Sequence, residues 1–218
     1  MGPSAPPAPV GSTPYTLPVA TPTRSHRPTL MAGPSGVGKS TLVQRLLTDY
    51  PAVWLSVSVT TRAPRPGERE GEHYYFVSDA EFDDLVAGGA LLEWAVYNAA
   101  RYGTPAGPVR AALAAGKAPL LEIDLAGVRQ ARRRLPDART VLVVPPSREE
   151  LARRLARRGT EDPEAQGRRL AVAESELAAA PEFDKVLVND RLERALAELV
   201  DFMRLCAPEA TCGRTAHE

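Results

Sequence analysis

A glycine-rich stretch between an apolar segment and a helical pattern constrains the fold of this chain more than any other feature. Residues 29–32 (TLMA) predict a short strand, and residues 33–41 follow as GPSGVGKST. Apolar residues then recur at helical spacing across 42–47. The stretch satisfies the complete Walker A pattern, in the strand–loop–helix context that the pattern requires. We therefore expect an α/β fold with a mostly parallel sheet.

Each residue type in this loop suits the binding of phosphate groups. Glycine lets backbone N–H groups turn around phosphate oxygens without a Cβ in the way, and the dipole of the following helix favours an anion. Lys39 is the expected catalytic cation on the β- and γ-phosphates of ATP, and the Ser40 hydroxyl is the expected ligand of Mg²⁺. The predicted ATP site comprises Gly33, Pro34, Ser35, Gly36, Val37, Gly38, Lys39, Ser40 and Thr41. A glycine turn without a ligand is the alternative, and the complete motif argues against it.

Apolar strands and helical patterns alternate along the rest of the chain. Further strands are predicted at 56–61, 73–77, 91–97, 119–123, 140–144 and 185–188. Capping boxes at 78–81 and 147–150 predict two helix starts, Asp162-Pro163 predicts a third, and Asn189 or Asp190 is the expected cap of the last helix. This alternation is typical of a parallel sheet covered by helices on both faces.

Composition limits the partners and the compartment. Residues 1–27 are rich in Pro, Ala, Ser and Thr, so we expect a disordered tail there, and another at 207–218. The 27 basic and 27 acidic residues balance, which gives no sign of a nucleic-acid or membrane partner. The two cysteines, Cys206 and Cys212, lack the spacing of a zinc site. No signal-peptide pattern is found, and we expect a cytoplasmic protein.

Several further segments, in order, resemble the guanylate kinase family. The resemblance covers about residues 28–204. Its blocks are GPSGVGKST at 33–41, SVSVTTRAPRPGE at 56–68, GxxYxFV at 71–77, LEWA at 92–95, YGT at 102–104, IDxxG at 123–127 and RRGT at 157–160. It implies transfer of a phosphoryl group from ATP to GMP, with dGMP as a further candidate acceptor and Mg²⁺ bound with ATP. It also implies a domain at 28–206, with a GMP-binding insertion at about 56–98 and a lid at about 154–175.

The resemblance places a second, acceptor pocket on the inserted segment. Arg62 and Arg65 lie on a polar loop, and the planar fork of arginine suits phosphate oxygens. The implied GMP-binding residues are Ser58, Arg62, Arg65, Glu68, Tyr74, Glu93, Tyr102, Thr104 and Asp124. Two arginines on a polar loop are, taken alone, more often solvated surface. The surrounding blocks favour the phosphate-binding interpretation.

Glu93 is the candidate for choosing the base, because it lies on an otherwise apolar strand. An ionised carboxylate only accepts hydrogen bonds. Guanine presents two adjacent donors, N1–H and the 2-amino group, whereas adenine has an acceptor at N1 and no 2-amino group. A carboxylate therefore favours guanine. The alternative is an ordinary surface carboxylate on an edge strand.

The chain departs from the family pattern at Glu122, where many members carry aspartate. An acid is kept, and whether Glu122 binds the metal directly is left open. Thr104 and Val59 also stand where serine is frequent. Thr104 keeps a hydroxyl, and Val59 is expected to be structural.

Arginines in the lid are the remaining catalytic candidates. Arg154 and Arg158 are four residues apart and share a helix face, and Arg169 lies on the next helix. Phosphoryl transfer needs positioning and positive charge, and the resemblance implies that these three close over the phosphates of ATP. The usual meaning of an arginine run is a solvated face, which we expect for Arg153, Arg157 and Arg168.

Two other functions fit part of the pattern. One is a guanylate-kinase-like interaction module that has lost catalysis, which the intact Lys39, Ser40, Arg62, Arg65 and Glu93 argue against. The other is a related kinase of a different phosphorylated acceptor, such as a ribose phosphate.

Overall fold

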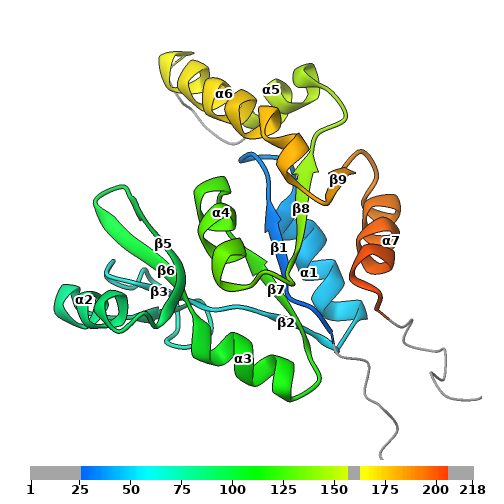
Figure 1. Ribbon diagram of the computed structural model, residues 1–218. Coiled ribbons are helices and arrows are strands. Elements are labelled where there is room, and N and C mark those ends of the chain that lie inside the picture. The colour runs from blue at the N-terminus through cyan, green and yellow to red at the C-terminus, as the bar shows by residue number, and fades with distance from the viewer. Residues whose placement is uncertain (1–25, 157–162, 206–218) are drawn as a thin grey trace, which may run out of the picture.

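The core of the protein is a five-stranded sheet in which all neighbouring strands are parallel. The computed structural model describes residues 26–156 and 163–205 (Figure 1). The strand order is β2-β7-β1-β8-β9. The strands are β1 (Thr29–Ala32), β2 (Val53–Leu55), β7 (Ala118–Glu122), β8 (Arg139–Val144) and β9 (Lys185–Val188). The central β1 is entirely buried, which explains its unbroken apolar sequence.

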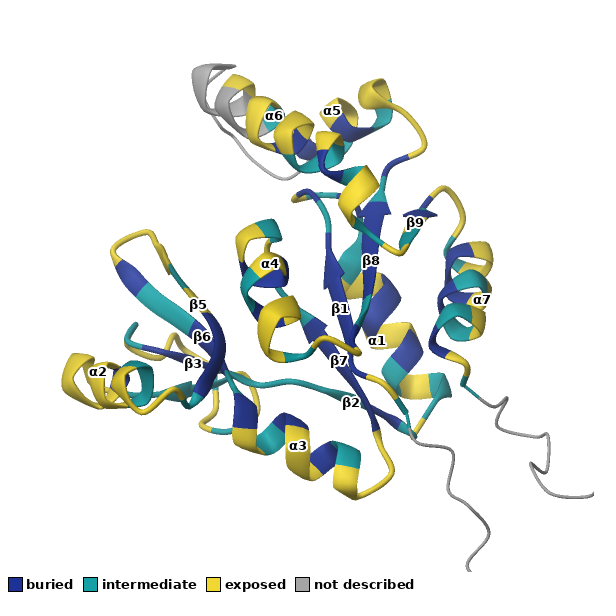
Figure 2. Cartoon of the chain, in the orientation of Figure 1, coloured by how far each residue is buried: buried dark blue, intermediate teal, exposed yellow. Residues whose placement is uncertain are grey.

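Helices cover both faces of this sheet. Helices α1 (Lys39–Asp49) and α7 (Leu192–Met203) lie on one face, and α3 (Ala106–Ala114) and α4 (Leu125–Arg134) on the other (Figure 1). Successive residues of β1 alternate between the two cores: Met31 packs with α1 and α7, whereas Leu30 and Ala32 pack with α3 and α4. Figure 2 shows the resulting band of buried residues through the sheet. The predicted fold class is confirmed.

A second, four-stranded sheet lies beside the core. Its order is β4-β3-β6-β5, with α2 (Asp79–Ala87) packed on it through the buried Phe82. The strands are β3 (Ser58–Thr60), β4 (Tyr74–Phe76), β5 (Leu91–Tyr97) and β6 (Ala100–Pro105). The sheet extends past residue 98, where we expected the insertion to end, because β6 pairs with both β3 and β5.

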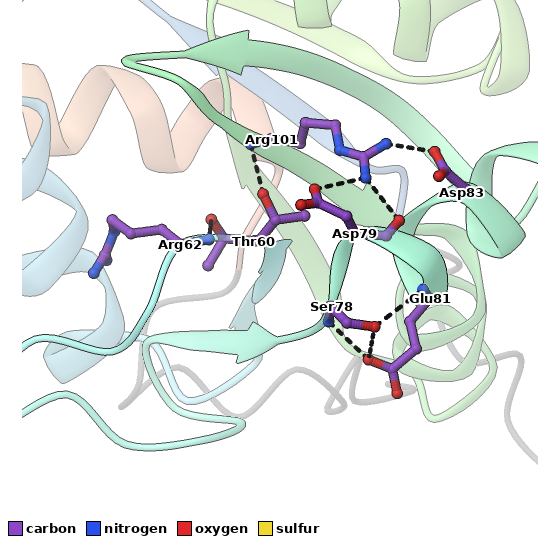
Figure 3. Close-up of polar contacts among 8 residues, drawn as sticks. Thr60, Arg62, Ser78, Asp79, Glu81, Asp83 and Arg101 are labelled. Carbon is purple, nitrogen blue, oxygen red and sulfur yellow. Dashed lines mark hydrogen bonds and ion pairs between the residues drawn. The ribbon is translucent and has the colours of Figure 1, made fainter.

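Arg101 on β6 fixes α2 against this sheet (Figure 3). Its guanidinium donates to Asp83 Oδ1 at 2.6 Å and to the side chain and backbone of Asp79 at 2.7 Å. Its backbone N–H donates to Thr61 Oγ1 at 3.1 Å. The predicted capping box at Ser78 is confirmed and sets the start of α2. These bonds hold the turn that leads into Arg62.

The segment predicted to be a lid, at about 154–175, falls on α5 (Arg148–Ala156) and α6 (Pro163–Ala178), and a 3₁₀ turn at Ala180–Glu182 follows. Both helices lie above the carboxyl edge of the core sheet (Figure 1). Residues 157–162 are outside the described ranges, as are most of 1–27 and the tail after 205. Within the described residues, no helix has the length and apolar character needed to cross a membrane.

Some predicted element boundaries are wrong, and some elements were not predicted. The strand expected at 56–61 covers only 58–60, and β2, β6, α3 and α4 were not expected. Neither Asn189 nor Asp190 caps α7, which begins at Leu192 with Arg191 at the N-cap. The Asn189 side chain is instead buried, and it makes a contact with the phosphate loop that is described next.

Candidate active site

The glycine-rich loop connects β1 to α1 at the carboxyl edge of the core sheet, as predicted. Gly33 and Gly38 have φ values of 150° and 90°. A Cβ at Gly33 would lie 2.3 Å from Val143 O, and one at Gly38 would lie 2.7 Å from Asn189 Nδ2. Glycine is therefore required at both positions by conformation and by space.

Two side chains hold the loop at the carbonyl of Val37. Asn189 Nδ2 donates to Val37 O at 2.7 Å, and Arg154 Nη1 donates to the same oxygen at 3.2 Å. Arg154 also donates to Asn189 O at 3.2 Å and to Glu150 Oε1 at 2.6 Å. Sequence reasoning missed Asn189, although an asparagine directly after a buried strand at this edge is a usable signal. Helix α5 and the turn before α7 thus keep the loop in shape.

Of the three arginines predicted to act in the lid, Arg154 is the one whose side chain lies in the described part of the chain, and it contacts the loop. Arg154 lies against backbone carbonyls, as given above. Arg158 falls outside the described residues. Arg169 lies on α6, and its side chain is likewise outside what is described. Their closure over phosphates stays a prediction.

Lys39 is the first residue of α1, and its ammonium group points back to the loop. Lys39 Nζ donates to Gly33 O at 2.6 Å and to Pro34 O at 3.2 Å. Ser40 and Thr41 follow in the first turn of the helix and are exposed. The loop therefore offers a cation, a helix N-terminus and an accessible hydroxyl in one place.

A cavity of about 420 Å³ lies between the second sheet and the core. All the predicted acceptor residues except Thr104 line it, together with Ala95, Tyr97, Glu122 and Ile123. Its full lining is Ser58, Arg62, Arg65, Glu68, Tyr74, Glu93, Ala95, Tyr97, Tyr102, Glu122, Ile123 and Asp124. The alternation of side chains along β5 would have found Ala95 and Tyr97, because they share a face with Glu93.

Arg62 is held in this cavity by a two-point pair with Glu68. The Nη1–Oε2 and Nη2–Oε1 distances are 2.9 and 2.8 Å, and Glu68 Oε2 also accepts from Arg65 N at 2.7 Å. The hydrogen bonds from Arg62 and from the Arg65 backbone lower the pKa of Glu68 to about 2. The Arg62 guanidinium lies 5.4 Å from the centre of the Tyr74 ring. The loop that carries both arginines is therefore pre-shaped by Glu68.

Glu93 is buried, with 7% of its surface exposed, so the interpretation as a surface carboxylate is wrong. Its Oε1 accepts a 2.6 Å hydrogen bond from Thr104 Oγ1, and the two residues are partners in the β5–β6 ladder. Burial raises the pKa of Glu93, the hydroxyl of Thr104 opposes this shift, and the nearby charge of Asp124 adds to it. Thr104, which does not line the cavity itself, orients the carboxylate that does.

The first turn of α4 packs directly against Glu93, and Gly127 makes this possible. Asp124 is the N-cap of α4 and accepts a 2.6 Å hydrogen bond from Gly127 N. A Cβ at Gly127 would lie 2.9 Å from Glu93 Oε2 and 3.1 Å from Asp124 Oδ1. Gly127 belongs to a block that carried the resemblance, but sequence reasoning gave it no role.

Replacement of Gly127 by alanine is expected to raise the KM for GMP about tenfold or more. The new methyl group must displace the Glu93 carboxylate, and the loss of one hydrogen bond to a charged group costs about 1.5–3 kcal/mol. Alanine favours a helix over glycine, so the melting temperature should not fall much. Steady-state kinetics and thermal unfolding measure both effects.

Gly107→Ala is the matched control, because Gly107 is also in a helix and a Cβ there would meet nothing within 4 Å. An unchanged KM for GMP in Gly127→Ala would show that the close packing of α4 on Glu93 does not matter for the acceptor.

Comparisons with known proteins agree with this geometry. The sequence pattern of the family described as guanylate kinase matches residues 25–205. A guanylate kinase of Streptomyces coelicolor is 54% identical over 191 residues, which cover 88% of this chain and 97% of that protein. One from Thermobifida fusca is 59% identical over 174 residues, or 80% of this chain and 89% of that protein.

A solved structure is similar as well. The crystal structure of guanylate kinase from Anaplasma phagocytophilum superposes with a TM-score of 0.63 at 30% identity, covering 83% of this chain and 85% of that one. The family pattern, the close relatives and this fold cover almost all of the described residues. The chain therefore belongs to the guanylate kinase family.

Proposed function

We propose that this enzyme transfers the γ-phosphoryl group of ATP to GMP and releases ADP and GDP. The observation that carries the proposal is that the glycine-rich loop and the arginine-lined cavity both open at one edge of the core sheet. The glycine-rich loop follows β1, and Asp124 in the wall of the acceptor cavity comes shortly after β7. Since β1 and β7 are parallel neighbours, the phosphates of a donor and an acceptor can face each other there.

The acceptor phosphate is assigned to the arginine end of the cavity. The Arg62 fork, oriented by Glu68, and Arg65 supply positive charge, and the hydroxyl groups of Tyr74 and Tyr102 supply donors. A phosphate oxygen of GMP is already an anionic nucleophile, so the transfer needs no general base. The protein contributes position and charge.

The base is assigned to the Glu93 end. A buried carboxylate that Thr104 orients can accept hydrogen bonds from N1–H and the 2-amino group of guanine. Adenine offers no such pair of donors, so the buried carboxylate would keep only its hydrogen bond from Thr104, which is a large penalty. Ser58 lines the same cavity and can serve as a further hydroxyl for the base.

The donor is assigned to the glycine-rich loop. Lys39 would exchange the carbonyl oxygens of Gly33 and Pro34 for the phosphate oxygens of ATP. Mg²⁺ neutralises phosphate charge when it is bound with ATP, and it prefers oxygen ligands and retained waters. The exposed Ser40 hydroxyl at the start of α1 fits it. Arg158 and Arg169 are proposed to bring the lid over the phosphates and to exclude water.

The two alternative functions fit the site less well. An interaction module does not require an ordered phosphate loop with its lysine, and a ribose phosphate does not require a buried carboxylate held by a threonine. A cytoplasmic location belongs to the proposal, because ATP and GMP are metabolites of that compartment.

The test is a coupled assay of ADP release with ATP, Mg²⁺ and one acceptor at a time: GMP, dGMP, AMP, UMP or ribose 5-phosphate. We expect GMP to exceed AMP and UMP by about a hundredfold or more in kcat/KM. Hydrolysis of ATP without an acceptor should be slow. Equal use of AMP, or fast hydrolysis without an acceptor, would contradict the proposed function.

A further inference from the structure

A third phenol, that of Tyr97, lines the acceptor cavity from the outer end of β5. Side chains alternate along this strand, and Glu93, Ala95 and Tyr97 all line the cavity. The intervening Trp94 and Val96 lie on the other face of the ribbon. Tyr97 is thus a component of the cavity wall, although the proposed function gave it no part.

Tyr97 continues a row of aromatic rings that begins at the phosphate-binding arginine. The Tyr97 and Tyr102 rings are 6.5 Å apart, edge to face, and the Tyr102 and Tyr74 rings are 5.9 Å apart in a similar arrangement. Tyr74 in turn contacts the Arg62 guanidinium, 5.4 Å from its ring centre. The row therefore leads from Arg62 to the tip of the hairpin.

The position of Tyr97 along β5 places it at the phosphate end of the acceptor. Glu93, which is assigned to the base, lies four residues earlier on the strand, or about 13 Å at the usual rise. Tyr102, which is assigned to the phosphate, pairs with Ala95 between them. Along β5 from Glu93 toward the hairpin tip, Tyr97 therefore lies beyond the position of Tyr102.

The exposure of Tyr97 also fits a residue that a ligand covers. Tyr97 is 73% exposed, whereas Tyr74 and Tyr102 are only partly exposed. Figure 2 shows the exposed outer end of the β5–β6 hairpin. A tyrosine that presents an apolar ring and a polar tip to a binding cavity gains contacts when the ligand arrives.

We propose that Tyr97 is a further acceptor-binding residue, whose hydroxyl donates to the phosphate of the nucleoside monophosphate and whose ring closes that end of the cavity. This inference rests on the proposed function. The O–H of a tyrosine side chain is a hydrogen-bond donor, as a phosphate oxygen requires.

Binding of GMP and of guanosine to Tyr97→Phe, measured by calorimetry, tests the proposal. Phenylalanine keeps the ring and removes only the donor. We expect GMP to bind about five- to tenfold more weakly, the size of one lost hydrogen bond, and guanosine to bind within about twofold of the wild type. The KM for GMP should rise in parallel while the KM for ATP stays unchanged. Tyr97→Ala should weaken GMP binding further.

Val96→Ala is the matched control, because Val96 is the next residue, is 65% exposed and does not line the cavity. It should bind GMP like the wild type. If Tyr97→Phe binds GMP as tightly as the wild type, or if it weakens GMP and guanosine equally, the role of Tyr97 is refuted and the proposed function stands. If the wild type itself does not bind GMP, the proposed function fails.

Discussion

Replacement of Lys39 by alanine is expected to lower kcat by about a thousandfold while the protein stays folded. Removal of one preorganised group that stabilises transition-state charge costs about 10²–10³ in kcat, and we propose that Lys39 places its positive charge at the transferring phosphoryl group. The loop itself should survive, because Asn189 and Arg154 hold it at Val37 O. Turnover at saturating ATP and GMP, together with thermal unfolding, measures both parts.

Lys117→Ala is a suitable control for the loss of a lysine. Lys117 is exposed and donates to Pro51 O at 3.0 Å, after the last turn of α3 and outside the residues of either proposed site. It should leave kcat unchanged. Near-normal turnover in Lys39→Ala would remove the glycine-rich loop from the mechanism.

The phosphate loop could be predicted from the sequence because its geometry is local. Nine consecutive residues contain the strand exit, the positive-φ glycines and the helix start. The contacts that support the loop could not be predicted in the same way. Asn189 is 152 positions from Val37 in the chain. Its neighbours in the sequence suggested a helix cap, but its side chain bonds to the distant loop instead.

The acceptor site shows the same division. Its residue types could be taken from the resemblance, but the burial of Glu93 depends on Gly127 of α4, a helix that was not predicted. Strand β6 was also missed, because its sequence, ARYGTP, has few strand-forming residues. Pairing with β3 and β5 on both sides makes it a strand.

Replacement of Glu93 by glutamine is expected to lower kcat/KM for GMP by about a hundredfold or more, with the KM for ATP changed less than about threefold. Glutamine keeps the shape of the side chain but replaces one acceptor oxygen with an NH₂ donor. Two donors of guanine would then face a donor in a buried site, where unpaired polar groups are costly. Among the hydrogen bonds of the described residues, none joins Glu93 to the glycine-rich loop. The substitution should therefore have little effect on the binding of ATP.

The pH dependence gives this prediction a second readout. Because burial raises the pKa of Glu93, its carboxylate takes up a proton at a higher pH than an ordinary glutamate. The wild-type KM for GMP should therefore begin to rise on acidification at a higher pH than an ordinary glutamate would cause, and this component of the rise should be missing in Glu93→Gln. If the substitution raised the KM for ATP and the KM for GMP equally, Glu93 would not be the residue that recognises the base. In that case guanine selection must come from other groups in the cavity, with Ser58 the first to examine.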